Sequence, residues 1–245
     1  MDEYNKTQLY PQTTFERHVF HRDQFAHYLR WSIVLRKAKI GMKILDLGCG
    51  DGNLAEVLYR NRYKAKQYLG IDIRHGAVSK AKQRFENVPW IEFKQNDVCK
   101  PRFYGKFDII ACFEVAEHLG KSNIKKLIET IKINADKNTK ILLSTPCYDE
   151  SVGAAANHMI QGEVGEFTYD EMKDTLCSEF NVINNYGTFA SVKDYKKRMS
   201  QCELSVYSRL YEYFDSNLLS VIFAPLYPQY SRNCLWELEL NKDEV

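Results

Sequence analysis

The sequence contains no Cys-x-x-Cys pair, no long hydrophobic run and no large excess of charge of either sign. Its seven irregularly spaced cysteines argue against a zinc ribbon or a disulfide framework and favour reduced, mostly buried thiols. The best apolar run, 218–226, is far shorter than the roughly 20 residues of a transmembrane helix. The first residues are polar and acidic, unlike a signal peptide. We therefore expect a soluble, cytoplasmic protein without a membrane partner.

The charge and composition are those of an ordinary globular protein. A chain of 245 residues with 44% hydrophobic residues can bury a sizeable core in one or two domains. The net charge of +2 gives no overall attraction to nucleic acid. Two local basic clusters, interleaved with aromatic residues, could still track a phosphate backbone, or they could be solvated helix faces. Their members are Arg17, His18, Arg22, His27, Arg30, Arg36, Lys37 and Lys39, and then Lys193, Lys196, Lys197 and Arg198.

The most informative stretch is 44–53, which predicts a short buried strand, a glycine-rich turn and the start of a helix. Glycines at 48, 50 and 52 allow a sharp turn and let a ligand approach the backbone closely. The next predicted strand, 67–72, ends in Asp72, where a carboxylate is well placed to hold the two hydroxyls of a ribose. Together these features indicate a cofactor that contains a nucleoside.

The glycine pattern favours one kind of nucleoside cofactor. Dinucleotide sites usually have Gly-x-Gly-x-x-Gly, whereas here the pattern is Gly-x-Gly-x-Gly, with Asp46 before the turn and Asp51 inside it. Fixed carboxylates would repel a pyrophosphate, but they suit the ammonium and sulfonium groups of S-adenosylmethionine. The alternative is a nucleotide-binding α/β domain with unrelated chemistry.

Segments 46–52, 70–73, 96–98 and 107–110 resemble, in order and spacing, the successive motifs of the class I S-adenosylmethionine-dependent methyltransferases. The resemblance covers about residues 40–148. It implies a Rossmann-like α/β fold whose seven-stranded, mostly parallel sheet has an antiparallel last strand. It also implies that Asp46 lies near the methionine moiety, Asp72 at the ribose and Asp97 at the adenine edge. The full set of implied cofactor residues is Asp46, Gly48, Gly50, Asp72, Ile73, Asp97, Val98 and Glu114.

Hydrophobic patterns predict the elements of this fold along the chain. We expect a helical N-terminal cap in 1–40, and a methyltransferase domain in 41–245 with a helical insertion in 192–230 before the last strand. A capping box at Thr168 and Glu171 predicts the start of one helix, after a long loop at 147–166. The predicted strands are 44–47, 67–72, 90–95, 107–112, 139–144, 180–186 and 234–240, and the other predicted helices are 53–61, 75–86 and 122–134.

A second candidate site, Glu114-x-x-Glu117-His118, follows the fourth predicted strand. At this spacing on a helix the three side chains share a face and could bind a divalent cation. The segment resembles that of the small-RNA 2′-O-methyltransferases and the ubiquinone-pathway O-methyltransferases, where it binds a magnesium-type ion. The resemblance implies Mg²⁺ or Mn²⁺ at Glu114, Glu117 and His118, with His158 as the natural fourth ligand. The further His-x-Asp-His pattern of the small-RNA enzymes is absent here.

Two other readings of this segment stay open. It could form a metal-free polar pocket, with His118 or His158 as a base or an orienting group, or its role could be structural. The predicted function is methyl transfer from S-adenosylmethionine to an oxygen or nitrogen nucleophile, with Glu114, Glu117, His118 and His158 as candidate catalytic residues. The acceptor could be a nucleic acid or nucleotide, or a small molecule. The non-enzymatic alternative is a catalytically inactive methyltransferase fold that acts as a binding or scaffold protein.

Overall fold

The structure is a computed structural model that describes residues 22–149, 159–160, 163–189, 210, 213–214, 219 and 222–241. His158, Arg17, His18 and most of the predicted insertion, with its basic cluster at 193–198, lie outside these residues. The division into a cap, a domain and an insertion therefore stays a prediction. None of the helices within the described part is long and apolar enough to cross a membrane.

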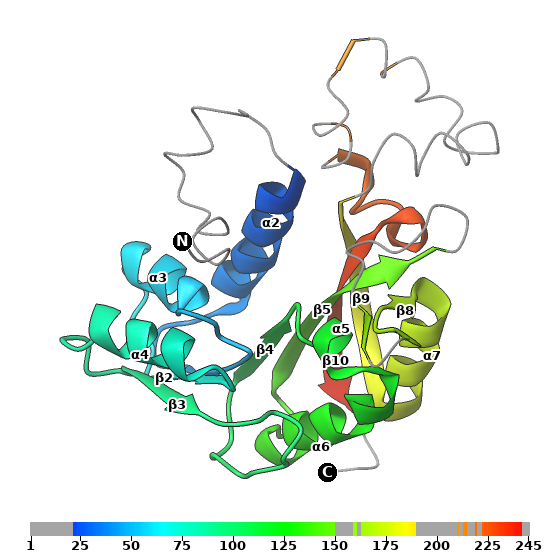
Figure 1. Ribbon diagram of the computed structural model, residues 1–245. Coiled ribbons are helices and arrows are strands. Elements are labelled where there is room, and N and C mark those ends of the chain that lie inside the picture. Colours follow the sequence, from blue (N-terminus) through cyan, green and yellow to red (C-terminus); the bar gives the residue numbers. More distant parts are fainter. Residues whose placement is uncertain are drawn as a thin grey trace.

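A twisted sheet forms the centre of the fold (Figure 1). Its main path runs in the order β3-β2-β1-β4-β5-β10-β9, and β1 to β5 are parallel to one another. The last strand, β10, is antiparallel to both of its neighbours. The strands of this path are β1 (Lys43–Leu47), β2 (Gln67–Asp72), β3 (Ile91–Gln95), β4 (Ile109–Phe113), β5 (Lys140–Tyr148), β9 (Phe180–Phe189) and β10 (Asn233–Leu240). The predicted Rossmann-like sheet is confirmed.

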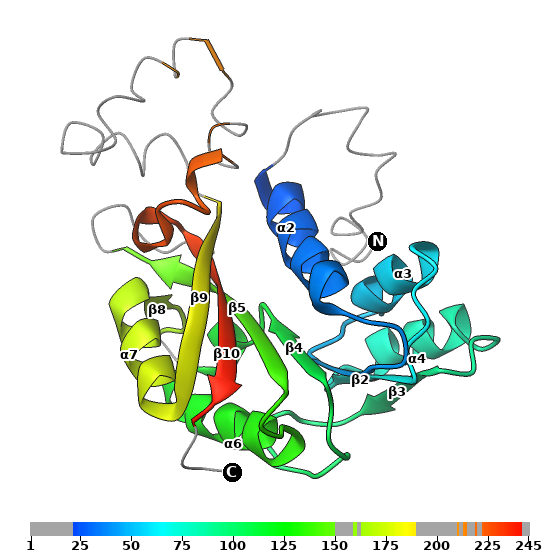
Figure 2. The ribbon, with the colours of Figure 1, turned by 180° about the vertical axis from the view of Figure 1, so that it is seen from behind.

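Helices cover both faces of the sheet, as the two views show (Figures 1 and 2). On one face lie α2 (Arg22–Lys37), α3 (Asn53–Arg60) and α4 (His75–Arg84). On the other lie α5 (Ala116–Leu119), α6 (Ile124–Asn134) and α7 (Tyr169–Glu179). Because successive strand residues point to opposite faces, Ile44 packs in the first layer and Leu45 in the second. This explains why the central strands are continuous apolar runs.

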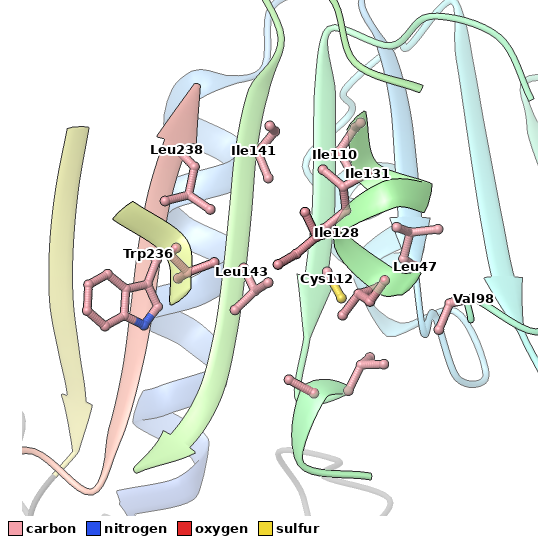
Figure 3. Packing of buried hydrophobic residues seen from close by; sticks show 14 of the residues in the cluster. Leu47, Val98, Ile110, Cys112, Ile128, Ile131, Ile141, Leu143, Trp236 and Leu238 are labelled. Atoms are coloured by element: carbon pink, nitrogen blue, oxygen red, sulfur yellow. The ribbon is translucent and has the colours of Figure 1, made fainter. Parts of the chain in front are cut away.

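The larger hydrophobic cluster fixes the strand ends that carry the candidate site (Figure 3). Leu143 of β5 and Trp236 of β10 are almost completely buried, as is Ile128 of α6. Burial of each such side chain contributes about 1.5–3 kcal/mol. The cysteines of the described residues are free, and four of them are buried, as expected for reduced thiols: Cys49, Cys112, Cys147 and Cys234.

The predicted strands and helices of the described part are present, with ends shifted by a few residues. The fourth strand begins at Ile109, not at 107, because the amide of Phe107 donates to the carbonyl of Asn134. The capping box is confirmed, since Thr168 and Glu171 each accept a bond from the other's backbone amide, at 3.1 and 2.8 Å.

The prediction of one long loop over 147–166 is wrong in part. β5 continues to Tyr148, because the amide of Cys147 donates to the carbonyl of Arg232 beside β10 (2.8 Å). A short antiparallel pair, β6 (Met159–Ile160) and β7 (Glu163–Val164), lies inside the predicted loop. β8 (Phe167–Thr168) then pairs with the end of β5 and adds an eighth strand to the sheet. The longer β5 and the addition of β8 arise from pairing between segments far apart in the sequence, which local patterns do not encode.

Candidate active site

A cleft of about 520 Å³ opens at the carboxyl ends of β1, β2 and β4. This is the edge at which open α/β sheets bind their ligands. Its lining residues are Gly48, Asp72, Ile73, Arg74, Asp97, Val98, Glu114, Val115, His118 and Leu119. The structure thus brings together six of the eight predicted cofactor residues, while Asp46 and Gly50 do not line the cleft themselves.

The glycine turn forms one wall of the cleft. The amides of Gly48 and Cys49 donate to the carbonyl of Ile71 at 2.7 and 3.0 Å, which ties the turn to β2. Gly48 has a φ of 82°, and a Cβ built there would lie only 2.2 Å from Cγ2 of Val115. Glycine is therefore required here both by the left-handed backbone and by the close approach of the segment after β4.

Asp72 is held rigidly at the tip of β2. Its buried carboxylate accepts hydrogen bonds from the amide of Gly50 (2.9 Å) and from the amide and Nε of Arg74 (2.9 and 3.0 Å). The Arg74 side chain is 45% exposed, so its guanidinium can give way to a ligand hydroxyl at modest cost. Sequence reasoning did not find Arg74, because its role depends on a side chain folding back over the turn.

Asp46 is a buried acid at the end of β1. The hydroxyl of Tyr68 donates to its carboxylate. Burial, and to a smaller extent the negative charge of Asp72, raise the pKa of Asp46 to about 7, although the bond from Tyr68 works in the opposite direction. A cation bound in the cleft would favour the ionised form of this acid.

Asp97 has a structural role as well as a place in the cleft. Its Oδ1 accepts from the amide of Cys99 at 2.8 Å and closes the turn that follows β3. This turn cap and the predicted adenine contact are compatible in one side chain.

The carboxylate of Glu114 is held in a polar network that joins α2 to the sheet. Its backbone has a φ of 56°, which is uncommon for a residue other than glycine. Its carboxylate accepts from Nη1 of Arg30 (2.6 Å), Oγ of Ser144 (2.7 Å) and Nδ2 of Asn233 (2.7 Å). Such left-handed residues concentrate at functional sites, where surrounding contacts compensate the strain.

The basic surface expected along the N-terminal helix is only partly present. Arg30 is 2% exposed and also bonds to Nδ1 of His27 (3.1 Å). Burial, with a smaller effect of Arg30, lowers the pKa of His27 to about 3, so this imidazole is neutral. Lys37, the last residue of α2, forms an ion pair with Glu237 of β10 at 2.5 Å. A fully solvent-facing basic helix is therefore wrong for Arg30 and Lys37, whose acidic partners lie outside the helix, and His27 carries no charge to contribute.

Glu117 and His118 lie on α5 but do not converge with Glu114 on one point. Glu117 is buried, and burial together with the charge of Glu114 raises its pKa well above the usual range. His118 is 55% exposed in its side chain, and its Nε2 lies 3.9 Å from Oε1 of Glu117. In the described part of the chain no group of three or more His, Cys, Asp or Glu residues could hold a metal ion.

These three residues therefore do not fit the predicted metal site as they stand. Both oxygens of Glu114 accept from cationic or neutral donors, and burial disfavours the ionised form of Glu117, whereas metal ligands must be deprotonated. His158, the fourth predicted ligand, lies outside the described residues. The Mg²⁺ or Mn²⁺ site stays a prediction, and no reaction step below depends on it.

Comparison with known proteins identifies the family. Residues 20–181 match the family model described as "Methyltransferase domain". The chain belongs to this methyltransferase family. The match extends over the glycine turn, Asp72, Asp97 and the Glu114–His118 segment, and it confirms the resemblance to the class I S-adenosylmethionine-dependent superfamily.

Relatives resemble this methyltransferase over part of its length. It is 39% identical over 80 residues to the mitochondrial ubiquinone biosynthesis O-methyltransferase of Saccharomyces cerevisiae, covering 32% of this chain and 25% of that protein. It is 35% identical over 96 residues to the ubiquinone biosynthesis O-methyltransferase of Acinetobacter baumannii, covering 37% and 39%. The matches thus span well under half the length of these curated relatives.

A solved structure supports the fold. An N-methyltransferase from Bradyrhizobium japonicum in complex with S-adenosyl-L-homocysteine superposes with a TM-score of 0.58, at 14% identity, over 92% of this chain and 90% of that one. At this identity the likeness concerns the fold alone.

Proposed function

We propose that this chain is an S-adenosylmethionine-dependent methyltransferase that methylates a hydroxyl group of a small molecule. The observation that carries the proposal is the cleft at the carboxyl ends of β1, β2 and β4, with a buried carboxylate, Asp72, at its edge. Asp72 would accept from the ribose hydroxyls after displacing Arg74. Asp97 and Val98 would border the adenine, and Gly48 would let the methionine part approach the turn. The negative charge of ionised Asp46 would attract the positively charged donor.

When bound, S-adenosylmethionine supplies an electrophilic methyl carbon on a sulfonium. An acceptor oxygen forms the new bond to that carbon while the bond to sulfur breaks, and the electron pair of the broken bond stays on the now neutral sulfur. Catalysis then consists chiefly of holding the acceptor in line, a task for the rigid strand ends. The acceptor proton needs a base, and His118, which lines the cleft and is half exposed, is the candidate among the described residues.

The names of the relatives favour an oxygen acceptor on a small molecule, since two of them are O-methyltransferases of ubiquinone biosynthesis. The inward orientation of Arg30 and Lys37 also removes part of the surface that was expected to bind phosphates. A nucleic acid acceptor is the second candidate, favoured by a separate basic pocket that is described below. Its basis is independent of the relatives named above, which match 32% and 37% of this chain.

The proposal is tested by transfer of a tritiated methyl group from S-adenosylmethionine to fractionated small metabolites, RNA and DNA. We expect label in a hydroxyl-containing metabolite fraction, and we expect the Asp72→Ala variant to lose it. Label in RNA or DNA alone would establish the second candidate. If no fraction is labelled although the wild-type protein binds S-adenosylmethionine, the inactive scaffold alternative holds. A parallel reaction with chelator tests the predicted metal: loss of labelling that Mg²⁺ or Mn²⁺ restores would establish it.

A further inference from the structure

A second cavity of about 430 Å³ lies beside the cofactor cleft, along β3. β3 is an edge strand of the sheet (Figure 1). Its size is within the roughly 300–1,000 Å³ typical of small-ligand pockets. It is lined by Lys82 of α4, by the end of β3 and the residues after it, and by the loop before β4. The lining residues are Lys82, Lys94, Gln95, Asn96, Arg102, Phe103 and Tyr104. None of the catalytic or cofactor residues discussed above is among them.

The charge of this pocket is of one sign. Three of its seven lining side chains are cationic, and no acidic residue is among those that line it. Two further cations, Lys100 and Lys106, come from the same loop, and Nζ of Lys106 lies 5.9 Å from the ring centre of Phe103. The whole chain carries a net charge of only +2, so this concentration is local. Nζ of Lys94 lies 3.0 Å from Oε1 of Glu92, so part of its charge is compensated, at an exposed pair that a ligand can compete with. The excess of cations still favours an anion in this pocket.

The pocket also has an exposed aromatic ring. Phe103 is 64% exposed, although it is one of the larger apolar side chains of the chain. Tyr104 beside it is fixed, since Nδ2 of Asn96 donates to its hydroxyl at 2.6 Å and Oδ1 of Asn134 accepts from its amide at 2.7 Å. The loop that presents Phe103 is therefore anchored at the neighbouring residue. An exposed aromatic ring next to cations is the arrangement with which proteins hold single-stranded nucleic acid.

The position of the pocket relates it to the methyl donor. Gln95 and Asn96 line the pocket, whereas the next two residues, Asp97 and Val98, line the cofactor cleft. The two cavities therefore lie on either side of one short segment. A ligand in the basic pocket would be a neighbour of the adenosine end of the donor.

We propose that this pocket binds single-stranded nucleic acid, with phosphates at Lys82, Lys94 and Arg102 and one base stacked on Phe103. Phosphodiesters supply the negative charges that match the three cations, and a base supplies the flat face that an exposed phenyl ring binds. The proposal concerns binding and does not depend on methyl transfer. It deepens the second candidate function, because an RNA held here would lie close to the cofactor.

The test is a fluorescence anisotropy titration of the full chain with a short labelled oligouridine at several salt concentrations. For the variant Lys82→Ala/Lys94→Ala/Arg102→Ala we expect the Kd to rise at least about tenfold at low salt. We also expect the slope of log K against log salt to fall by about 2, since each lost phosphate contact on a single strand contributes roughly 0.7. For Phe103→Ala we expect the Kd to rise about fivefold or more, without a change in slope.

A matched control removes three exposed lysines at the opposite, amino-terminal ends of β2 and β5: Lys64→Ala/Lys66→Ala/Lys137→Ala. It changes the net charge equally and should bind the oligonucleotide as the wild type does. Equal weakening by both triple variants, no binding by the wild type, or an unchanged Kd for Phe103→Ala would overturn the proposal. Binding of anionic lipid vesicles without binding of the oligonucleotide would also overturn it. Binding of S-adenosylmethionine, measured on the same samples by calorimetry, tests the proposed function independently of oligonucleotide binding.

Discussion

The ion pair between Arg30 and Glu114 joins α2 to the candidate active site and can be measured by a double-mutant cycle. We consider Arg30→Met, Glu114→Gln and the double variant. Nη1 and Oε1 are 2.6 Å apart, and the side chains are 3% and 27% exposed. With charge centres about 4 Å apart, the Coulomb attraction is about 4 kcal/mol at an effective dielectric constant of about 20.

Part of this attraction is offset by the cost of burying the guanidinium. In Arg30→Met, Glu114 keeps its bonds from Ser144 and Asn233 and part of its exposure, so the loss is smaller than for a fully buried, orphaned charge. We therefore expect the single variant to lose about 2–3 kcal/mol of the free energy of unfolding. We expect a coupling energy between the two positions of about 1–3 kcal/mol.

Urea denaturation at neutral pH gives the four free energies of unfolding that the cycle needs. The matched control is Lys37→Met, which removes the other ion pair between α2 and the sheet, with Glu237 (2.5 Å). Both single variants should be destabilised, but only Arg30→Met should alter the affinity for S-adenosylmethionine, because Glu114 lines the cleft and Glu237 does not. A coupling energy below about 0.5 kcal/mol, which is the limit of additivity for independent sites, would refute the reasoning.

Three further predictions concern the cofactor cleft. Asp72→Asn should weaken binding of S-adenosylmethionine at least about tenfold, since hydrogen bonds to a charged partner contribute about 1.5–3 kcal/mol; unchanged calorimetric affinity would contradict the assignment of the ribose site. Gly48→Ala should lower the Tm and abolish cofactor uptake, because its Cβ would meet Val115 at 2.2 Å; a thermal melt like that of the wild type would show that the turn tolerates a side chain. The pKa of Asp46 is raised to about 7, so its carboxylate ionises between pH 6 and pH 8. The affinity for the sulfonium donor should increase about tenfold over this range, and Asp46→Asn should abolish the pH dependence. The pKa of Asp46 is higher in the folded than in the unfolded state, so the unfolded state loses this proton first and the free energy of unfolding falls as pH rises toward 7. At pH 8, urea denaturation should therefore show Asp46→Asn to be more stable than the wild type.

The turn and the strand ends could be predicted because their causes are local. Glycines at 48 and 50, a buried apolar run before them and an acid at the end of the next strand are all visible in the linear sequence. The structure places Asp72 and Gly48 in one cleft, as those patterns indicate. The capping box at Thr168 was predictable for the same reason, since both of its partners lie within one helical turn.

The polar network around Glu114 could not be predicted, because its partners come from distant parts of the chain. Arg30, Ser144 and Asn233 meet only when α2 crosses the sheet and β10 inserts between β5 and β9. A helical pattern also cannot show that Glu114 has a left-handed backbone, or that its carboxylate bonds to these donors. The extension of β5 to Tyr148 depends in the same way on pairing with β10 and with β8.

The account depends most on the claim that the cleft binds a positively charged sulfur nucleoside. Calorimetric titration of the full chain with S-adenosylmethionine, repeated with Asp72→Ala, tests this claim most directly. We predict saturable binding at one site per chain in the wild type and no measurable heat of binding in the variant. Absence of binding to the wild-type protein, or equal binding by the variant, would contradict the claim.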